Sequence, residues 1–367
     1  MDTMYMKKAI ELAKKGTGRT SPNPLVGAVV VRNGKIVGTG YHKKSGEPHA
    51  EIIALERAGA LSRGANLYVN LEPCNHRGRT PPCTEAIIKA GIKRVFIAIR
   101  DPNPLVDGKG IVKLRENGVE VFEGLMEEEA FKTNEIFFKY IQTKQPFVAL
   151  KTAISIDGKI ATKTGESQWI TGERARRHGH ILRNTYDAIL VGIGTVKKDN
   201  PRLTCRLPGK KGGNPIRIIV DSKLSINHDA RVFDADIAAS TLIATTNQAP
   251  LPKLQQIQKK AKVLLINKGL QVDLPTLLKR LGEMEIISIL VEGGSRINGS
   301  FIADNLVDKY YCYIAPIIIG GDRAPGAFGG EGVSVLTSAS KLMDVSINHL
   351  GEDLLLTGYL KKSVTAV

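Results

Sequence analysis

Two short stretches near the N-terminus hold residue types that can bind a transition metal. Residues 48–51 (PHAE) supply an imidazole at His49, and residues 72–83 (EPCNHRGRTPPC) supply thiols at Cys74 and Cys83. Zinc usually takes four ligands, and a catalytic zinc keeps one of the four positions for water. These three side chains would leave that position open. The pattern therefore predicts a catalytic zinc site at His49, Cys74 and Cys83.

Glu51, two residues after His49, is the natural proton carrier of such a site. Zinc lowers the pKa of a bound water towards ~7, and a nearby carboxylate can pass the released proton to a leaving nitrogen. Zinc deaminases carry His-x-Glu followed by Pro-Cys-x-x-Cys, and the Glu is not a ligand. Here Cys74 and Cys83 are farther apart than in that signature. A packed histidine with two buried cysteines is the alternative, and it explains fewer of these features.

The surrounding sequence alternates between strand and helix patterns in both halves of the chain. An Asn-Gly turn at 33–34 predicts a hairpin, and residues 143–146 resemble a linker. We therefore expect two α/β domains, residues 1–144 and 145–367. Expected helices cover 2–15, 50–58, 83–90, 109–117, 127–141, 173–184, 274–281 and 296–303. Expected strands cover 25–31, 36–41, 66–70, 95–99, 119–122, 147–152, 188–191, 216–221, 241–245, 287–291 and 309–314.

Composition and charge narrow the class of partner. The formal net charge is +16, and the first 144 residues carry 23 basic and 16 acidic side chains, so both halves are basic. Such a surface suits a small anionic substrate as well as a polyanion. Aromatic residues are only 5% of the chain and no basic run is interleaved with them, as a base-stacking platform would require. We expect a small-molecule substrate and no nucleic acid.

Targeting and assembly are predicted from weaker signals. No apolar run reaches the length of a membrane span, and the first residues lack the pattern of a signal or transit peptide. We therefore expect a cytoplasmic protein that does not associate with membranes. Four cysteines in a chain of this length do not make a disulfide framework. A homo-oligomer is expected only because such assemblies are common.

Two glycine pairs in the second half follow predicted strands. The turn Gly293-Gly294-Ser295 leads into a predicted helix, and free N–H groups at a helix start can bind phosphate. Gly192-Ile193-Gly194 also follows a strand, but Lys197 stands where a Rossmann fingerprint has its third glycine. A dinucleotide site in this half would therefore not be of the Rossmann type.

The first half resembles the deaminase half of the bifunctional riboflavin biosynthesis deaminase/reductase family. The resemblance rests on SPNPLVGAVV (21–30), PHAE and EPCNHRGRTPPC. It continues into the family's reductase half through KTAISIDGKIAT (151–162), SQWITG (167–172), VGIGTVKKDNPRLTCR (191–206) and VEGGSRINGSF (291–301). It thus covers nearly the whole chain. It implies an α/β fold with a cytidine-deaminase-like three-layer domain followed by a dihydrofolate-reductase-like α/β domain.

The resemblance also implies two reactions and their cofactors. Zinc-dependent hydrolysis would deaminate 2,5-diamino-6-ribosylamino-4(3H)-pyrimidinone 5′-phosphate. NADPH would then reduce the ribosyl side chain of 5-amino-6-(5-phosphoribosylamino)uracil to ribityl. By the same resemblance, His49, Cys74 and Cys83 hold Zn²⁺ and Glu51 is the acid/base.

Further site residues follow from the resemblance. Asn23 is expected to contact the substrate sugar, and His42, His76 and Arg79 are candidates for ring or phosphate contacts. For each of these, an ordinary turn or loop residue is the alternative. Arg183 and Arg206 suit a phosphate because guanidinium donors are forked. The NADPH site is expected at Ala153, Trp169, Thr195, Asp199, Ser222, Gly294, Ser295, Arg296, Ile297, Asn298, Gly299 and Ser300. The reductase substrate is expected at Lys151, Ser167, Arg183, Leu203, Arg206 and Glu292.

Two other hypotheses compete with the two-step enzyme. A nucleic-acid deaminase with a basic second domain would explain the charge, but the Cys74–Cys83 spacing and the reductase-like second half argue against it. A non-catalytic protein stabilised by zinc would explain the cysteines. Glu51 beside an open metal position argues against that hypothesis, because structural zinc is closed by four protein ligands.

Overall fold

The computed structural model describes residues 1–75, 81–207, 213–234, 239–266 and 269–360. These residues divide into two units, with the boundary between Lys144 and Gln145. Each unit has its own β-sheet and its own hydrophobic cores. Within the described part of the chain, no helix is both long and apolar enough to cross a membrane.

The sheet of the first unit has five strands in the order β2-β1-β3-β4-β5. Strand β1 pairs antiparallel with both β2 and β3, whereas β3, β4 and β5 run parallel to one another. The strands are β1 (Gly27–Arg32), β2 (Lys35–Tyr41), β3 (Asn66–Val69), β4 (Arg94–Ile97) and β5 (Glu120–Phe122). The predicted mixed α/β layer is thus confirmed.

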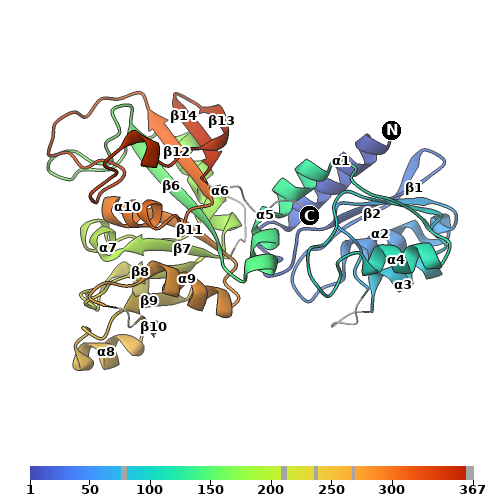
Figure 1. Ribbon diagram of the computed structural model, residues 1–367, viewed down its shortest axis with the longest axis horizontal. Coiled ribbons are helices and arrows are strands. Elements are labelled where there is room, and N and C mark those ends of the chain that lie inside the picture. The colour runs from blue at the N-terminus through green and yellow to red at the C-terminus, as the bar shows by residue number, and fades with distance from the viewer. Residues whose placement is uncertain (76–80, 208–212, 235–238, 267–268, 361–367) are drawn as a thin grey trace. The chain divides into compact units, whose positions relative to one another are not determined.

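Helices cover both faces of this sheet, which gives three layers (Figure 1). Alternate residues of a strand point to opposite faces, so Val30 packs in one core and Val29 in the other. One face carries α1 (Asp2–Ala13) and α5 (Glu127–Thr143). The other face carries α2 (Ala50–Ala58), α3 (Cys83–Lys89) and α4 (Lys109–Glu116).

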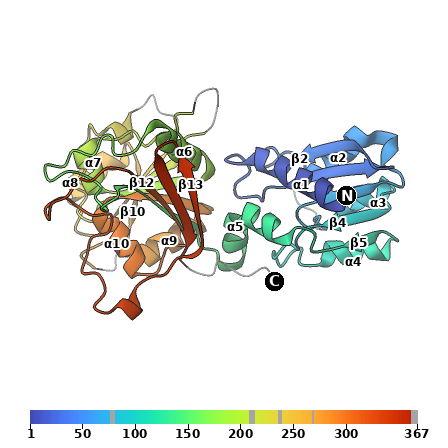
Figure 2. The same cartoon turned by 90° about the horizontal axis from the view of Figure 1, so that it is seen from above.

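The sheet of the second unit has nine strands in the order β10-β9-β8-β7-β11-β6-β12-β14-β13. In that order, pairing is parallel from β10 to β12 and antiparallel from β12 through β14 to β13. Strand β13, labelled in Figure 2, forms one edge of the sheet. The strands are β6 (Phe147–Ser155), β7 (Ala188–Gly192), β8 (Ile216–Val220), β9 (Thr241–Thr245), β10 (Lys262–Leu265), β11 (Ser288–Gly293), β12 (Lys309–Ala315), β13 (Met343–Leu350) and β14 (Asp353–Tyr359).

Two cores flank this second sheet as well. Leu190 and its neighbours pack with α9 and α10, whereas Ile189 and Val191 pack with α7 and α8. The helices are α6 (Glu173–Thr185), α7 (Ile193–Asp199), α8 (Leu251–Gln258), α9 (Leu274–Glu283) and α10 (Ser295–Ala303). Short 3₁₀ turns occupy Lys14–Gly16, Gly59–Ser62, Arg231–Phe233 and Leu336–Ser338.

The sequence patterns did not predict α7, α8, β10, β13 and β14. Most of β13 is exposed, and β10 is the opposite edge of the sheet. An edge strand has one neighbour rather than two, so its side chains face water more often and their hydrophobic alternation is weak. The short helix α7 follows a fully buried strand directly and has no polar cap that would mark its start.

Candidate active sites

Three predicted zinc ligands converge in the first unit. One donor atom each from His49, Cys74 and Cys83 lie within 4.8 Å of one another. The Nδ1 atom of His49 is 3.2 Å from Cys83 Sγ and 3.5 Å from Cys74 Sγ. Zinc bonds to nitrogen and sulfur are about 2.0–2.3 Å long, so one ion fits among three donors at this spacing. An imidazole and two thiols are also the donor types that zinc prefers.

Two helix starts place these ligands. His49 is the residue before α2, and Cys83 is the first residue of α3. The strand β2 lets α2 approach closely because Gly40 has no side chain; a Cβ there would collide with the carbonyl oxygen of Ala50. The partial positive charge at a helix N-terminus favours thiolate over thiol. The fold therefore assembles the cluster at two helix starts, where a metal-bound thiolate would be stabilised.

The pKa values of the two cysteine thiols are shifted in opposite directions. The S–H of Cys83 and the ring of His49 donate to the sulfur of Cys74 and lower the pKa of that thiol to about 4. The same pairing with Cys74, together with burial, raises the pKa of Cys83. Hydrogen bonding to Cys74 also raises the pKa of His49. A divalent cation among these groups would replace the shared protons, because metal ligands bind in their deprotonated forms.

Glu51 lies beside the cluster in the first turn of α2. Glu51 is 3% exposed, and its Oε2 atom has no hydrogen-bond partner among the described residues. Burial raises the pKa of this carboxyl to about 6. A buried carboxylate oxygen without a partner is unfavourable unless another molecule bonds to it. The residues present thus fit a metal site in which a water molecule bonds to Glu51.

The structure brings two further predicted residues to this site. The buried ring of His42 packs edge-on against His49, with the centroids 5.5 Å apart. Because Nδ1 of His42 lies 3.2 Å from the carbonyl oxygen of Pro48, it carries the proton, and Nε2 accepts from the amide of Asn23 at 3.2 Å. His42 thus links Asn23 to the segment that carries His49. The predicted residues His76 and Arg79 lie outside the described residues.

A large cleft in the second unit gathers most of the predicted cofactor residues. Its volume is about 1350 Å³. The predicted NADPH residues that line it are Ala153, Trp169, Thr195, Asp199, Ser222, Gly294, Ser295, Arg296, Ile297, Asn298 and Ser300. Gly299 instead packs against the backbone of Gly329, where a Cβ would collide with a carbonyl oxygen. The cleft is large enough for a dinucleotide, and the start of α10 opens onto it.

Two smaller cavities, of about 360 and 380 Å³, hold the predicted substrate residues. Lys151 lines the first and also the large cleft, and Ser167 lines the second and also the large cleft. Leu203 lines only the second of these cavities. Arg183, Arg206 and Glu292 line both small cavities. The structure therefore places these predicted residues around cavities of one unit that share lining residues.

Glu292 organises the charges at this junction. Its side chain is 9% exposed, and Arg183 binds it with two hydrogen bonds of 2.6 and 2.8 Å. Lys151 Nζ lies 3.7 Å from its Oε2 atom. Burial alone would raise the pKa of Glu292, but Arg183 and Lys151 lower it to about 2. Two of the forked donors of Arg183 bind Glu292, whereas the side chain of Arg206 is exposed; their expected phosphate contacts stay predictions.

Some residues of the small cavities were not predicted. Arg176, His180 and Tyr313 line the 360 Å³ cavity. The guanidinium of Arg176 lies 4.8 Å from the centre of the Trp169 ring. A signal for the first two was present: Arg176, His180 and Arg183 have the i, i+4, i+7 spacing of one helix face. Tyr313 had no such signal, because its place follows only from the pairing of β12 with β6.

Comparison with known proteins covers both units. Residues 1–99 match the cytidine and deoxycytidylate deaminase zinc-binding region, and residues 146–356 match the RibD C-terminal domain. The riboflavin biosynthesis protein RibD of Bacillus amyloliquefaciens is 46% identical over 361 residues, which cover 98% of this chain and 97% of the relative.

Solved structures agree over the same length. A diaminohydroxyphosphoribosylaminopyrimidine deaminase/5-amino-6-(5-phosphoribosylamino)uracil reductase from Thermotoga maritima is 42% identical, with a TM-score of 0.87 and coverage of 98% of this chain and 99% of that one. Acinetobacter baumannii RibD (form 1) is 35% identical, with a TM-score of 0.89 and the same coverage. This chain therefore belongs to the RibD family of bifunctional riboflavin biosynthesis enzymes, which join a zinc-dependent deaminase to an NADPH-dependent reductase.

Proposed function

We propose that the residues assembled in the two units carry out the two steps of this family. The first unit would deaminate the diaminopyrimidine ribosyl phosphate, and the second would reduce the ribosyl group of the product to ribityl. The observation that carries the proposal is the buried, unpartnered oxygen of Glu51 beside the open cluster of His49, Cys74 and Cys83. A purely structural zinc site would need neither the open position nor the carboxylate.

In the first step Glu51 moves one proton. Zinc held by the three ligands would supply a Lewis acid that makes a water molecule more acidic. Glu51 accepts a proton from that water while the oxygen adds to the ring carbon that bears the amine. Glu51 then gives the proton to the amine nitrogen, and the carbon–nitrogen bond breaks to release ammonia. Asn23, which is hydrogen-bonded to His42, is our candidate for orienting the sugar of the substrate.

In the second step the chain orients two molecules. NADPH would supply a hydride. The turn at Gly293 and Gly294, with the first N–H groups of α10, offers donors for the cofactor's phosphates. Lys151 and Glu292 line both the large cleft and the smaller cavity of 360 Å³. We therefore assign them to the region where the nicotinamide and the ribosyl carbon would meet. Arg206, exposed at the smaller cavities, is the better candidate for the substrate phosphate.

The experiment that tests this function follows both products in one assay. Purified zinc-loaded protein is given the diaminopyrimidine ribosyl phosphate, and ammonia release and NADPH oxidation are recorded with and without NADPH. We expect ammonia in both reactions and NADPH oxidation only after ammonia has appeared. Absence of both signals would contradict the proposed substrate. Ammonia without NADPH oxidation would contradict the reductase assignment alone.

The homo-oligomer and the cytoplasmic location stay predictions.

A further inference from the structure

Glu72 is a buried carboxylate two residues before the predicted zinc ligand Cys74. It is 4% exposed and forms no ion pair with any described residue. Backbone N–H groups surround it instead. Its Oε1 accepts from Gly110 at 3.0 Å and Ile111 at 3.3 Å, and its Oε2 accepts from Gly108 at 3.0 Å and Asp101 at 3.4 Å. The carboxylate thus caps the N-terminus of α4, where both the free N–H groups and the helix dipole favour an anion.

The same helix end also contacts the residue between Glu72 and Cys74. A Cβ built on Gly110 would collide with the carbonyl oxygen of Pro73 and would lie 3.1 Å from Glu72 Oε1. The backbone of α4 therefore approaches the loop as closely as a residue without a side chain permits. Because Cys74 lies in neither a helix nor a strand, its position depends on contacts of this kind.

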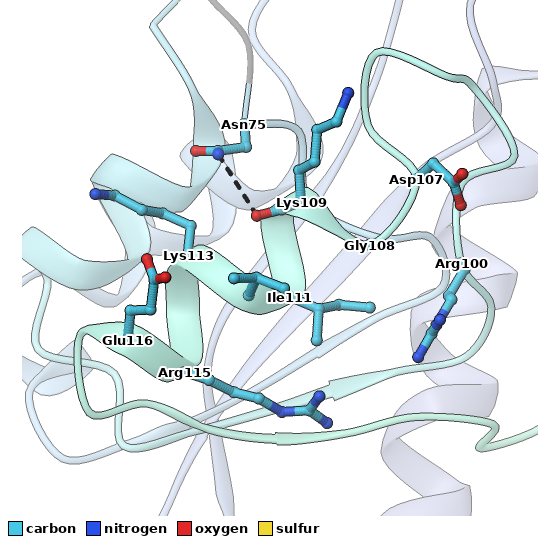
Figure 3. A pocket seen from close by; sticks show the side chains of 10 residues that line it. Asn75, Arg100, Asp107, Gly108, Lys109, Ile111, Lys113, Arg115 and Glu116 are labelled. Carbon is cyan, nitrogen blue, oxygen red and sulfur yellow. Dashed lines mark hydrogen bonds between the residues drawn. The ribbon is translucent and has the colours of Figure 1, made fainter.

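Asn75 holds the loop from the other side of Cys74. Its amide nitrogen donates to the carbonyl oxygen of Lys109 at 3.5 Å, the dashed line in Figure 3. Its amide oxygen accepts from the hydroxyl of Thr84 at 2.8 Å, and the N–H of Thr84 donates to the carbonyl oxygen of Cys74 at 3.3 Å. The hollow of about 530 Å³ drawn in Figure 3 lies over this end of α4, and none of the described residues that line it was predicted as a site residue.

We propose that Glu72 is a positioning residue for zinc: by docking on α4, its carboxylate fixes Cys74 Sγ at bonding distance from the ion. The inference rests on the proposed role of Cys74 as a ligand. Residues that hold a metal ligand in place typically change metal affinity by about 10–100-fold when they are replaced. An ordinary capping residue would change stability and leave zinc affinity of the folded protein unaltered.

The test compares three variants of the full-length protein. Glu72→Gln removes the charge of the side chain but keeps its shape. Gly110→Ala acts from α4, because its Cβ would collide with the carbonyl oxygen of Pro73 in the loop. Leu114→Val is the matched control, because Leu114 is fully buried in α4 and faces the core rather than the loop. Zinc affinity is measured by competition with a chelator, well below the melting temperature of each variant. The absorption spectrum of the cobalt-substituted protein reports the geometry of the sulfur ligands.

We expect Glu72→Gln and Gly110→Ala to bind zinc at least about tenfold more weakly and to change the cobalt spectrum. Leu114→Val should lower the melting temperature and leave both readouts unchanged. Wild-type zinc affinity in Glu72→Gln, or an equal loss in Leu114→Val, would overturn the proposal. Cys74→Ser separates this result from failure of the proposed function. If that variant also kept wild-type zinc affinity, Cys74 would not be a ligand, and both proposals would fall.

Discussion

Glu51 is expected to transfer a proton and not to bind the metal. One substitution can therefore separate proton transfer from metal binding. Glu51→Gln keeps the size of the side chain and leaves all three predicted ligands in place. We expect zinc content to stay at the wild-type level and ammonia release to fall by at least about 10²-fold, the usual contribution of a general acid/base. Metal analysis and an ammonia assay measure the two. NADPH oxidation with pre-deaminated substrate is the control, and continued ammonia release would disprove the role of Glu51.

The Arg183–Glu292 pair predicts a pH-dependent loss of stability. The folded pKa of Glu292 is lowered to about 2, so its contribution is present above the unfolded pKa of 4.5 and is lost as pH falls towards 2. Arg183→Met leaves a buried carboxylate without its main partner, which typically costs about 3–5 kcal/mol. We therefore expect the variant to be least stable, relative to wild type, at pH 7. As the pH falls from 7 to 4 the difference should narrow, because the unpaired carboxyl can take up a proton.

Urea denaturation at pH 7 and pH 4, followed by circular dichroism, measures this difference. Arg177→Met is a suitable control, because Arg177 lies on the same helix and is exposed. A stability loss that did not depend on pH would mean that Arg183 acts by packing and not by its charge.

At the scale of elements, the turn between β11 and α10 presents the cofactor's predicted phosphate site. Gly293 has φ = +74°, and a Cβ there would collide with the amide of Asn298, which itself donates to the carbonyl oxygen of Ala327 at 2.9 Å. Gly293→Ala combines backbone strain of about 1–3 kcal/mol with displacement of that amide. We expect KM for NADPH to rise about tenfold or more and ammonia release to stay unchanged. An unaltered KM would mean that this turn does not contact the cofactor.

The same turn shows what the sequence could predict and what it could not. The glycine pair and the strand and helix around it were evident from the residues, as was the helix Ala50–Ala58 that follows His49. His49 and Cys83 could be assigned because they lie at helix starts, whereas Cys74 was assigned from its place in the motif. Glu72 could not be assigned a partner, since its four N–H donors come from residues 101–111 and meet it only after α4 packs. Edge strands such as β13 were missed because their side chains are exposed.

At the scale of the whole molecule, the two chemistries depend on separate sets of residues. The predicted zinc ligands all lie before residue 84, and the cleft of about 1350 Å³ is lined only by residues from Lys151 onward. Each hydrophobic core also draws its buried residues from one unit alone. Each predicted site is therefore built from the residues of one unit. This arrangement predicts that zinc removal disables one reaction and spares the other.

Treatment with a chelator, followed by removal of the chelate, tests this independence. Ammonia release should be lost and should return on addition of zinc, because the proposed deamination depends on zinc as its Lewis acid. NADPH binding should be unchanged. Trp169 reports it directly, since it is the only tryptophan in the chain and lines the cleft, so bound NADPH should quench its emission. If the metal-free protein no longer quenched on NADPH addition, the zinc site would be required for the second unit, and the two chemistries would not be independent.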